Sequence, residues 1–359
     1  MTSLLRWSHG SEGGSNADFL DRFEAVGTSI QATYAEAALT PRSYLDLLLA
    51  LTTERPVEFM LVEHEGVDIA RAAVFATHAP AGTGALGLYE AQPGSAGDEA
   101  TASIIHAAVG WAGRHDLRRL YAPVDANTWF RYRFVSSSTD PAPSPFAWEP
   151  QQPESYRTRF LAHGFDVAGS YETMGFAFPS DGPYTLEDLI EHTGGGTRVA
   201  QDAGFAFERV DARTDMDALL VELHPLCMEA FSENPLFEPI AVELFVAKYR
   251  TILDQTPGHL TFIARDGQGR LTGFMFAFPD DGWIVIKTVA VSGTARGRRL
   301  SSGLLNAVLA AGARAGLTKV VTALVRADNV SRFLVDPAKM PFVDRWERTY
   351  DLLSREVEP

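Results

Sequence analysis

Short apolar runs and longer amphipathic stretches alternate along the C-terminal half of the chain. Residues 259–266, 270–280 and 282–293 are rich in β-branched and aromatic side chains, and Asp-Gly turn signals separate them. Two stretches typical of helices precede these runs, at 215–231 and 239–253, with helix-breaking Asn-Pro and Glu-Pro pairs between them. The pattern predicts a pair of helices followed by three strands.

A further helix is predicted after the third strand. Its apolar side chains recur at helical spacing, at Leu300, Leu304, Leu305, Val308 and Leu309. Residues 205–210, 319–325 and 345–353 have strand patterns. The half is therefore predicted to have the order β-α-α-β-β-β-α-β-α-β, which is a mixed-sheet α/β fold.

The first half repeats this order about 200 residues earlier. Residues 58–66, 68–78 and 84–94 predict three strands, and residues 98–114 predict a helix. The Pro/Ser-rich segment 136–153 that follows is predicted to be a long surface excursion. The shared order suggests that the two halves are copies of one unit.

The clearest internal match is between residues 113–127 and 313–329. Both segments run from a helix end through a strand to an asparagine. We therefore predict two tandem domains, residues 1–190, with an N-terminal helical extension, and residues 205–359. The glycine-rich segment 191–204 is predicted to be the linker between them.

Composition and charge limit the class of function. The chain has 359 residues, a net charge of −15 and a single cysteine, Cys227. The acidic balance argues against broad nucleic-acid binding, and one cysteine excludes internal disulfides. No apolar run reaches the roughly 20 residues needed to cross a membrane, and the start lacks a signal-peptide pattern. We expect a cytoplasmic protein that binds neither membrane nor nucleic acid.

Two further features of composition bear on its chemistry and origin. The nine histidines show no metal-ligand spacing, so no metal site is expected, and no Gly-x-Ser-x-Gly nucleophile motif is present. Only four of the 31 basic residues are lysines, which together with abundant alanine suggests a GC-rich bacterial genome.

Three arginines precede the predicted helix at Leu300, in an otherwise acidic chain. Arg296, Arg298 and Arg299 repel one another and oppose the positive end of the helix dipole. That arrangement becomes favourable when an anion is bound among them, because the free N–H groups of a helix start also attract anions. The sequence therefore predicts a phosphate-binding loop here.

The C-terminal half, over about residues 205–353, resembles the GNAT superfamily of acyl-CoA-dependent N-acyltransferases. The resemblance lies in the apolar strand end Val289-Ala290-Val291, in the loop and helix start Arg296, Gly297, Arg298, Arg299, Leu300, Ser301, Ser302 and Gly303, and in Asn329 after the next strand. It implies that the strand end binds the pantetheine arm of CoA, that the loop binds the pyrophosphate, and that Asn329 contacts the pantetheine or cysteamine end. Arg299 and Ser301 replace two family glycines, and the arginines can compensate through charge-assisted bonds to phosphate.

The first half resembles the same family more weakly. Its loop at residues 90–100 has no arginine and carries Glu90, Asp98 and Glu99, which would repel a pyrophosphate. We therefore predict a degenerate copy that binds no donor. Residues 161–178 resemble the closing turn and strand hairpin of the fold. The C-terminal half has a single closing strand, so we expect that strand's partner to come from the first half.

The catalytic groups of the family are not all matched. The strand 284–291 carries no glutamate, only Lys287 and Thr288, and the position of the family's general-acid tyrosine is Asp336. The resemblance places the oxyanion contact at the backbone N–H of Ala290 or Val291.

The remaining candidates for proton transfer are His224, Glu229 and Glu233 in the helix pair. We take Glu233 as the leading candidate for the base and His224 as the second. Cys227 lies among apolar neighbours and is interpreted as a core residue.

The resemblance implies a function as well as a fold. We expect an N-acyltransferase that moves an acetyl or larger acyl group from acyl-CoA to the amine of a small molecule. An acyl carrier protein could replace CoA, since the arginines would suit an acidic carrier helix. The alternative from another class is a non-catalytic acyl-CoA-binding regulatory protein, which the missing glutamate and tyrosine favour.

Overall fold

The computed structural model describes residues 2–8, 16–35, 40–51, 55–78, 80–139, 142–179, 182–256, 258–335 and 343–358. Its described strands form one 13-stranded sheet that runs through both halves of the chain. The first half contributes β1 (Thr2–Ser8), β2 (Val57–His64), β3 (Val67–Ala76), β4 (Thr83–Ala91), β5 (Arg119–Ala122), β6 (Phe134–Ser138) and β7 (Asp166–Ala177). The second contributes β8 (Ala206–Arg209), β9 (Phe262–Arg265), β10 (Leu271–Asp280), β11 (Trp283–Val291), β12 (Lys319–Arg326) and β13 (Asp344–Glu356).

The helices follow the same division. Those of the first half are α1 (Asn16–Gln31), α2 (Arg42–Leu51), α3 (Ser95–Arg114) and α4 (Glu154–Ala162). Those of the second half are α5 (Leu186–Asp202), α6 (Met216–Ala230), α7 (Val242–Asp254), α8 (Leu300–Arg314) and the short 3₁₀ helices η1 (Gly293–Ala295) and η2 (Val330–Phe333). The predicted strands and helices of the C-terminal half are confirmed, except that between β12 and β13 the described residues form only the 3₁₀ turn η2.

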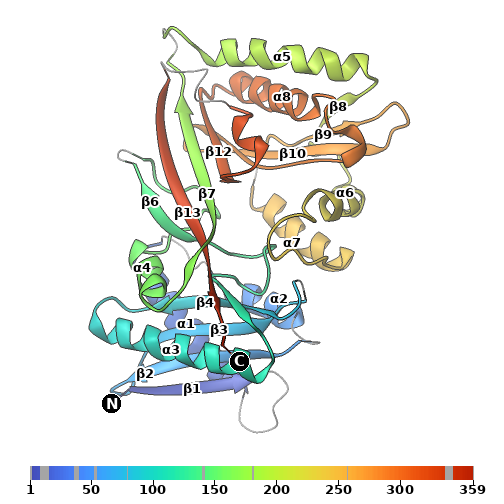
Figure 1. Ribbon diagram of the computed structural model, residues 1–359. Helices are drawn as coiled ribbons and strands as arrows, with labels where there is room; N and C mark the ends of the chain where they lie inside the picture. The colour runs from blue at the N-terminus through green and yellow to red at the C-terminus, as the bar shows by residue number, and fades with distance from the viewer. Residues whose placement is uncertain are drawn as a thin grey trace.

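The strand order is nearly a mirror image about its centre, β1-β2-β3-β4-β5-β13-β7-β12-β11-β10-β9-β8. The two central strands are exchanged between the halves. β7, from the first half, pairs with β12, and β13, from the second half, pairs with β5. β7 and β13 also pair with each other over most of their length, as the long green and red strands of Figure 1 show. The expected origin of the closing partner strand is therefore confirmed.

The hairpin predicted at residues 161–178 is wrong. This segment is the end of α4, a turn at Gly164 and the single strand β7, whose antiparallel partner is β13. A strand pattern shows that a segment will pair, but it does not say with which strand, because its partner can be distant in sequence. Here the partner lies far along the chain, at Asp344–Glu356.

Helices cover both faces of the sheet and define three apolar cores. α3 covers one face of the first half, and α8 with α5 covers one face of the second. The third core contains residues of α1, α2, α6 and α7 and extends across both halves. Within it the indole ring of Trp129 packs against Phe231, Phe237, Phe245 and Tyr249, which joins the first half to the α6–α7 region.

The predicted linker at residues 191–204 is also wrong, because most of this segment belongs to α5. Thr185 and Asp188 form a capping box at the start of the helix, which lies along α8 (Figure 1). Asn306 of α8 donates a hydrogen bond of 2.6 Å to the carbonyl of Ile190. A Cβ atom on Gly196 would lie 2.5 Å from the Cβ of Ser302, so glycine allows the two helices to approach closely.

Substitution within this glycine run tests the packing. We expect Gly196→Ala to lower the free energy of unfolding by about 1–3 kcal/mol, because α5 must move away from Ser302. Gly195 is the matched control, since a Cβ there meets no atom within 4 Å and alanine favours a helix. Denaturant unfolding of both variants measures the difference; equal effects would contradict close helix packing.

The segment 136–153 was predicted to be a surface excursion, and this prediction is wrong for part of it. Its start belongs to β6, which pairs with β13. Phe146 and Glu149 are buried, and the Glu149 carboxylate accepts hydrogen bonds from Arg348 and Tyr350 of β13. The composition suggested exposure throughout, but contacts with β13 bury part of the segment.

Candidate active site

The pairing between β11 and β12 ends part-way along β11, and we call the unpaired stretch the opening. The two strands pair in parallel from Trp283 and Lys319 to Ile286 and Thr322, and the pairing then stops. β11 continues to Val291, paired there with β10 alone. The strand edge that carries Val289, Ala290 and Val291 therefore has no strand partner on the β12 side, and its backbone groups can pair with an extended ligand.

A β-bulge lies at the base of this opening. Phe276 of β10 faces Thr288 and Ala277 faces Ile286, which leaves Lys287 as the extra residue. Bulges bend a strand and redirect side chains, and they are frequent beside active sites. The bulge marks the point at which β11 diverges from β12.

The loop after β11 has the features of an anion site. Arg296, Arg298 and Arg299 are exposed, and none forms an ion pair with another described residue. Arg299 is the N-cap of α8 and makes no side-chain cap, so the first N–H groups of the helix are free. Its φ of 63° lies in the left-handed region. The chain thus keeps a glycine-like backbone at Arg299 at a cost of about 1–2 kcal/mol.

Two of the predicted donor residues, Leu300 and Gly303, face the core and not the loop surface. Leu300 is buried, and a Cβ atom on Gly303 would overlap the ring of Phe207. Gly303 therefore lets α8 pack against β8. Ser301 and Ser302 are partly buried in the first turn. The groups left for an anion are the backbone N–H groups of the helix start and the three arginines.

Asn329 follows β12, and its side chain accepts a hydrogen bond of 2.9 Å from the N–H of Ser331. Asn127 makes the same turn in the first half, accepting from Trp129 at 3.1 Å. The two asparagines are the ends of the internal sequence match. Asn127 is buried, and its amide donates to Glu238 at 3.3 Å, whereas Asn329 is exposed and can reach a ligand.

The equivalent opening in the first half is filled by its own side chains. β4 and β5 pair only from Thr83 to Ala85 of β4. Beyond that point the Tyr156 hydroxyl accepts from the N–H of Ala91 at 3.0 Å and lies 2.9 Å from its carbonyl. The ring of Tyr89 packs against Tyr156 and in turn contacts the rings of Phe134 and Phe160. Tyr156 thus occupies the strand edge that would otherwise pair with pantetheine.

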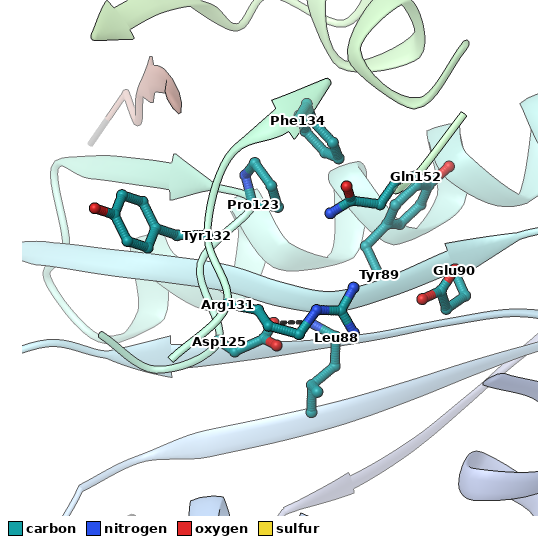
Figure 2. A pocket seen from close by; sticks show the side chains of 9 residues that line it. All are labelled: Leu88, Tyr89, Glu90, Pro123, Asp125, Arg131, Tyr132, Phe134 and Gln152. Atoms are coloured by element: carbon teal, nitrogen blue, oxygen red, sulfur yellow. Dashed lines mark hydrogen bonds between the residues drawn. The ribbon is translucent and has the colours of Figure 1, made fainter. Parts of the chain in front are cut away.

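Figure 2 shows the small pocket that remains there, with Arg131 between the carboxylates of Asp125 and Glu90. Glu90 is buried and accepts hydrogen bonds from Gln31 at 2.7 Å and Tyr34 at 2.6 Å. Although burial opposes its charge, Asp125 and Glu90 raise the pKa of Arg131. The pocket is a polar network with its charges compensated.

These contacts correct the expectation that the carboxylates of residues 90–100 keep a pyrophosphate out by repulsion. Glu90 points into the protein, and Asp98 is held by Arg159 at 2.7 Å. The absence of a donor in this half remains a prediction, but its physical basis is steric: Tyr156 and its aromatic neighbours fill the space.

The proton-transfer candidates lie in different surroundings. The Nε2 of His224 is 2.7 Å from the carbonyl of Ile240, and its ring packs on Phe245. Glu233 is exposed and makes no hydrogen bond with another described residue. Glu229 accepts from the N–H of Gly293 at 2.7 Å, so of the three only Glu229 contacts the end of the β11 segment.

Two other expectations concern Cys227 and Asp336. Burial raises the pKa of the Cys227 thiol to about 12, so it remains protonated at neutral pH and is a poor nucleophile, which agrees with a core role. Asp336 lies outside the described residues.

Three cationic side chains, Lys287, Lys248 and Arg133, lie near one another, with Lys287 at the bulge. The pKa of Lys287 is lowered to about 7, mainly by burial and in part by the nearby charges of Arg133 and Lys248. Burial likewise lowers the pKa of Lys248 to about 8. Sequence reasoning named Lys287 and missed Arg133 and Lys248. The scarcity of lysine was the available signal, because two of the four lysines meet here.

Comparisons with known proteins agree with this geometry. Residues 220–332 match the model of the acetyltransferase (GNAT) family. A tandem GNAT protein from the clavulanic acid biosynthesis pathway has 15% identity and a TM-score of 0.53, over 100% of this chain and 99% of that one. A GCN5-related N-acetyltransferase from Sphaerobacter thermophilus has 14% identity and a TM-score of 0.50, over 99% and 96%. A search of curated protein sequences finds no match.

The fold and the family match define the class of protein. The chain has the fold of tandem GNAT proteins, and its residues 220–332 match the GNAT family model. In the part of the chain that the structure describes, no three His, Cys, Asp or Glu side chains are grouped to hold a metal. Over the same residues, no helix has the length and apolar character needed to span a bilayer.

Proposed function

We propose that the protein is an N-acyltransferase that transfers an acetyl or larger acyl group from acyl-CoA to the amine of a small molecule. The observation that supports this most directly is the opening between β11 and β12 beside the uncapped start of α8. It combines a free strand edge for the pantetheine arm with a positive site for pyrophosphate. The family match at residues 220–332 covers both features.

The residues present fit CoA in this position. The backbone of Val289, Ala290 and Val291 would pair with the pantetheine arm, and Asn329 would contact its end. The N–H groups of Leu300, Ser301 and Ser302, with the three loop arginines, would hold the pyrophosphate. The opening thus binds the donor with its thioester toward the bulge at Lys287.

In the proposed reaction the neutral amine attacks the thioester carbonyl carbon. The backbone N–H of Ala290 or Val291 stabilises the oxyanion, the carbon–sulfur bond breaks, and the sulfur leaves as a thiolate that takes up a proton. The nitrogen loses its extra proton to a base, for which we propose Glu233 and, second, His224. Glu233 has the freer side chain, because His224 is held at the Ile240 carbonyl.

Glu233→Gln tests the base. A positioned base contributes about 10²–10⁴-fold, so we expect kcat to fall at least about tenfold while the Kd for CoA stays unchanged. Glu243→Gln is the control, because Glu243 is an exposed glutamate in the first turn of α7. Steady-state kinetics with calorimetry measures both quantities. Full activity in Glu233→Gln would show that the base is another group.

The same arginines would suit an acidic acyl carrier protein as the donor. Turnover with acyl-CoA, compared with turnover with an acylated carrier, separates these donors. Binding of CoA without turnover of any donor on a broad amine panel would favour the non-catalytic alternative.

A further inference from the structure

Lys287, Lys248 and Arg133 come from three separate parts of the fold. Lys287 is the bulged residue of β11, Lys248 lies on α7, and Arg133 follows β5 in the first half. Arg133 and Lys248 lie close enough to Lys287 to lower its pKa by repulsion. Bringing like charges together in a partly buried space is unfavourable unless an anion joins them.

The protein's own groups do not neutralise this cluster. Neither lysine forms a hydrogen bond or ion pair with any residue that the structure describes. The Nζ atom of Lys248 instead lies 4.7 Å from the centre of the Phe130 ring. The carboxylate of Glu149 acts on Lys287, but it is already bound to Arg348 and Tyr350. Burial raises the pKa of Tyr171 and of Tyr249, so these phenols stay neutral.

Arg133 carries two further signs of a binding role. It is 8% exposed, and its buried Nε has no hydrogen-bond partner among the described residues. Its guanidinium is stacked 3.7 Å from the centre of the Tyr132 ring and 4.1 Å from that of Tyr171. Its φ is 89°, a strained value for a side chain larger than glycine. The strain and the unpartnered Nε are both explained if Arg133 is held ready for a ligand.

We propose that Lys287, Lys248 and Arg133 bind the carboxylate of the acceptor, which is therefore an amine that also carries a carboxylate. This inference rests on the proposed acyl transfer and defines its acceptor class. The cluster begins at the bulge where β11 leaves β12, so an acceptor anchored there lies beside the open edge that binds the donor. The first half supplies Arg133, which gives the degenerate copy a role in substrate selection.

Matched acceptor pairs test the proposal. With acetyl-CoA as donor, kcat/KM is measured for a panel of L-amino acids and for their carboxamides, which keep the amine and lose the anion. We expect the acids to be preferred at least about 100-fold, since a polar site left unpaired by a substrate rejects it strongly. Equal rates for acids and amides would overturn the proposal while leaving acyl transfer intact.

Lys248→Met tests the site itself. The variant should lose at least about tenfold in kcat/KM for the acids and little for the amides. It should fold, because methionine removes a buried charge without adding volume. Lys319→Met is the matched control: Lys319 also lies over an aromatic ring, Trp283 at 5.3 Å, but it is exposed on β12. An unchanged preference for acids in Lys248→Met would overturn the proposal.

A binding readout separates this proposal from the catalytic one. In CoA-saturated protein, the amino acids should raise Tm and their carboxamides should not, whether or not transfer occurs. Stabilisation without turnover would support the anion site and contradict the proposed function. No stabilisation by any acid, with turnover of neutral amines, would contradict the anion site alone.

Discussion

Replacing Arg296 and Arg298 together with alanine is expected to weaken CoA binding by about 2–4 kcal/mol, the sum of two charge-assisted hydrogen bonds. Both side chains are exposed and have no ion-pair partner among the described residues, so their loss leaves the fold intact. Added salt should also weaken binding to the unmodified protein, because part of the attraction is screened Coulomb energy.

Isothermal titration calorimetry with CoA measures this effect and its stoichiometry. Arg314→Ala is the matched control, because Arg314 is an exposed arginine in the last turn of the same helix, where a positive charge suits the dipole. We expect one CoA per chain, since Tyr156 fills the opening of the first half. Unchanged affinity in the double variant, or two sites per chain, would contradict the assigned donor site.

Replacing Lys287 with methionine is expected to stabilise the protein near neutral pH. The pKa of Lys287 is lowered from 10.5 to about 7 in the folded state, with burial as the main cause. Between these values the unfolded chain binds more protons than the folded one, so the stability of the unmodified protein falls as pH decreases from about 10 to 7. The methionine variant lacks this loss. A shift of this size corresponds to about 4 kcal/mol at pH 7.

The stability difference should therefore be largest near pH 7 and shrink toward pH 10. Glu149 is paired with Arg348, and Lys248, with a pKa of about 8, contributes its own smaller slope. Denaturant unfolding at several pH values measures the difference, with Lys319→Met as the control. A destabilised Lys287→Met variant at pH 7 would show that the ammonium has a stabilising partner in the free protein.

Sequence reasoning predicted the fold well where the evidence was local. The tandem repeat, the exchanged closing strand and the order of strands and helices in the second half are confirmed, apart from the helix expected between β12 and β13. The donor residues and Glu233 stay predictions. The linker was wrong because a glycine run can be a flexible segment or a close helix contact, and only the presence of Ser302 against Gly196 distinguishes them.

The sequence by itself determined most of the helices and strands, and it indicated the loop that we propose as the donor site. Apolar periodicity, turn residues and three arginines before a helix are properties of neighbouring residues, so they can be read without knowing the partners. The tertiary structure decided which residues meet across long separations. Tyr156 reaches Ala91, Glu90 turns inward to Gln31, and Arg133 of the first half approaches Lys287 of the second. Burial and unpaired charge exist only after the chain has folded, because they depend on residues far apart in sequence.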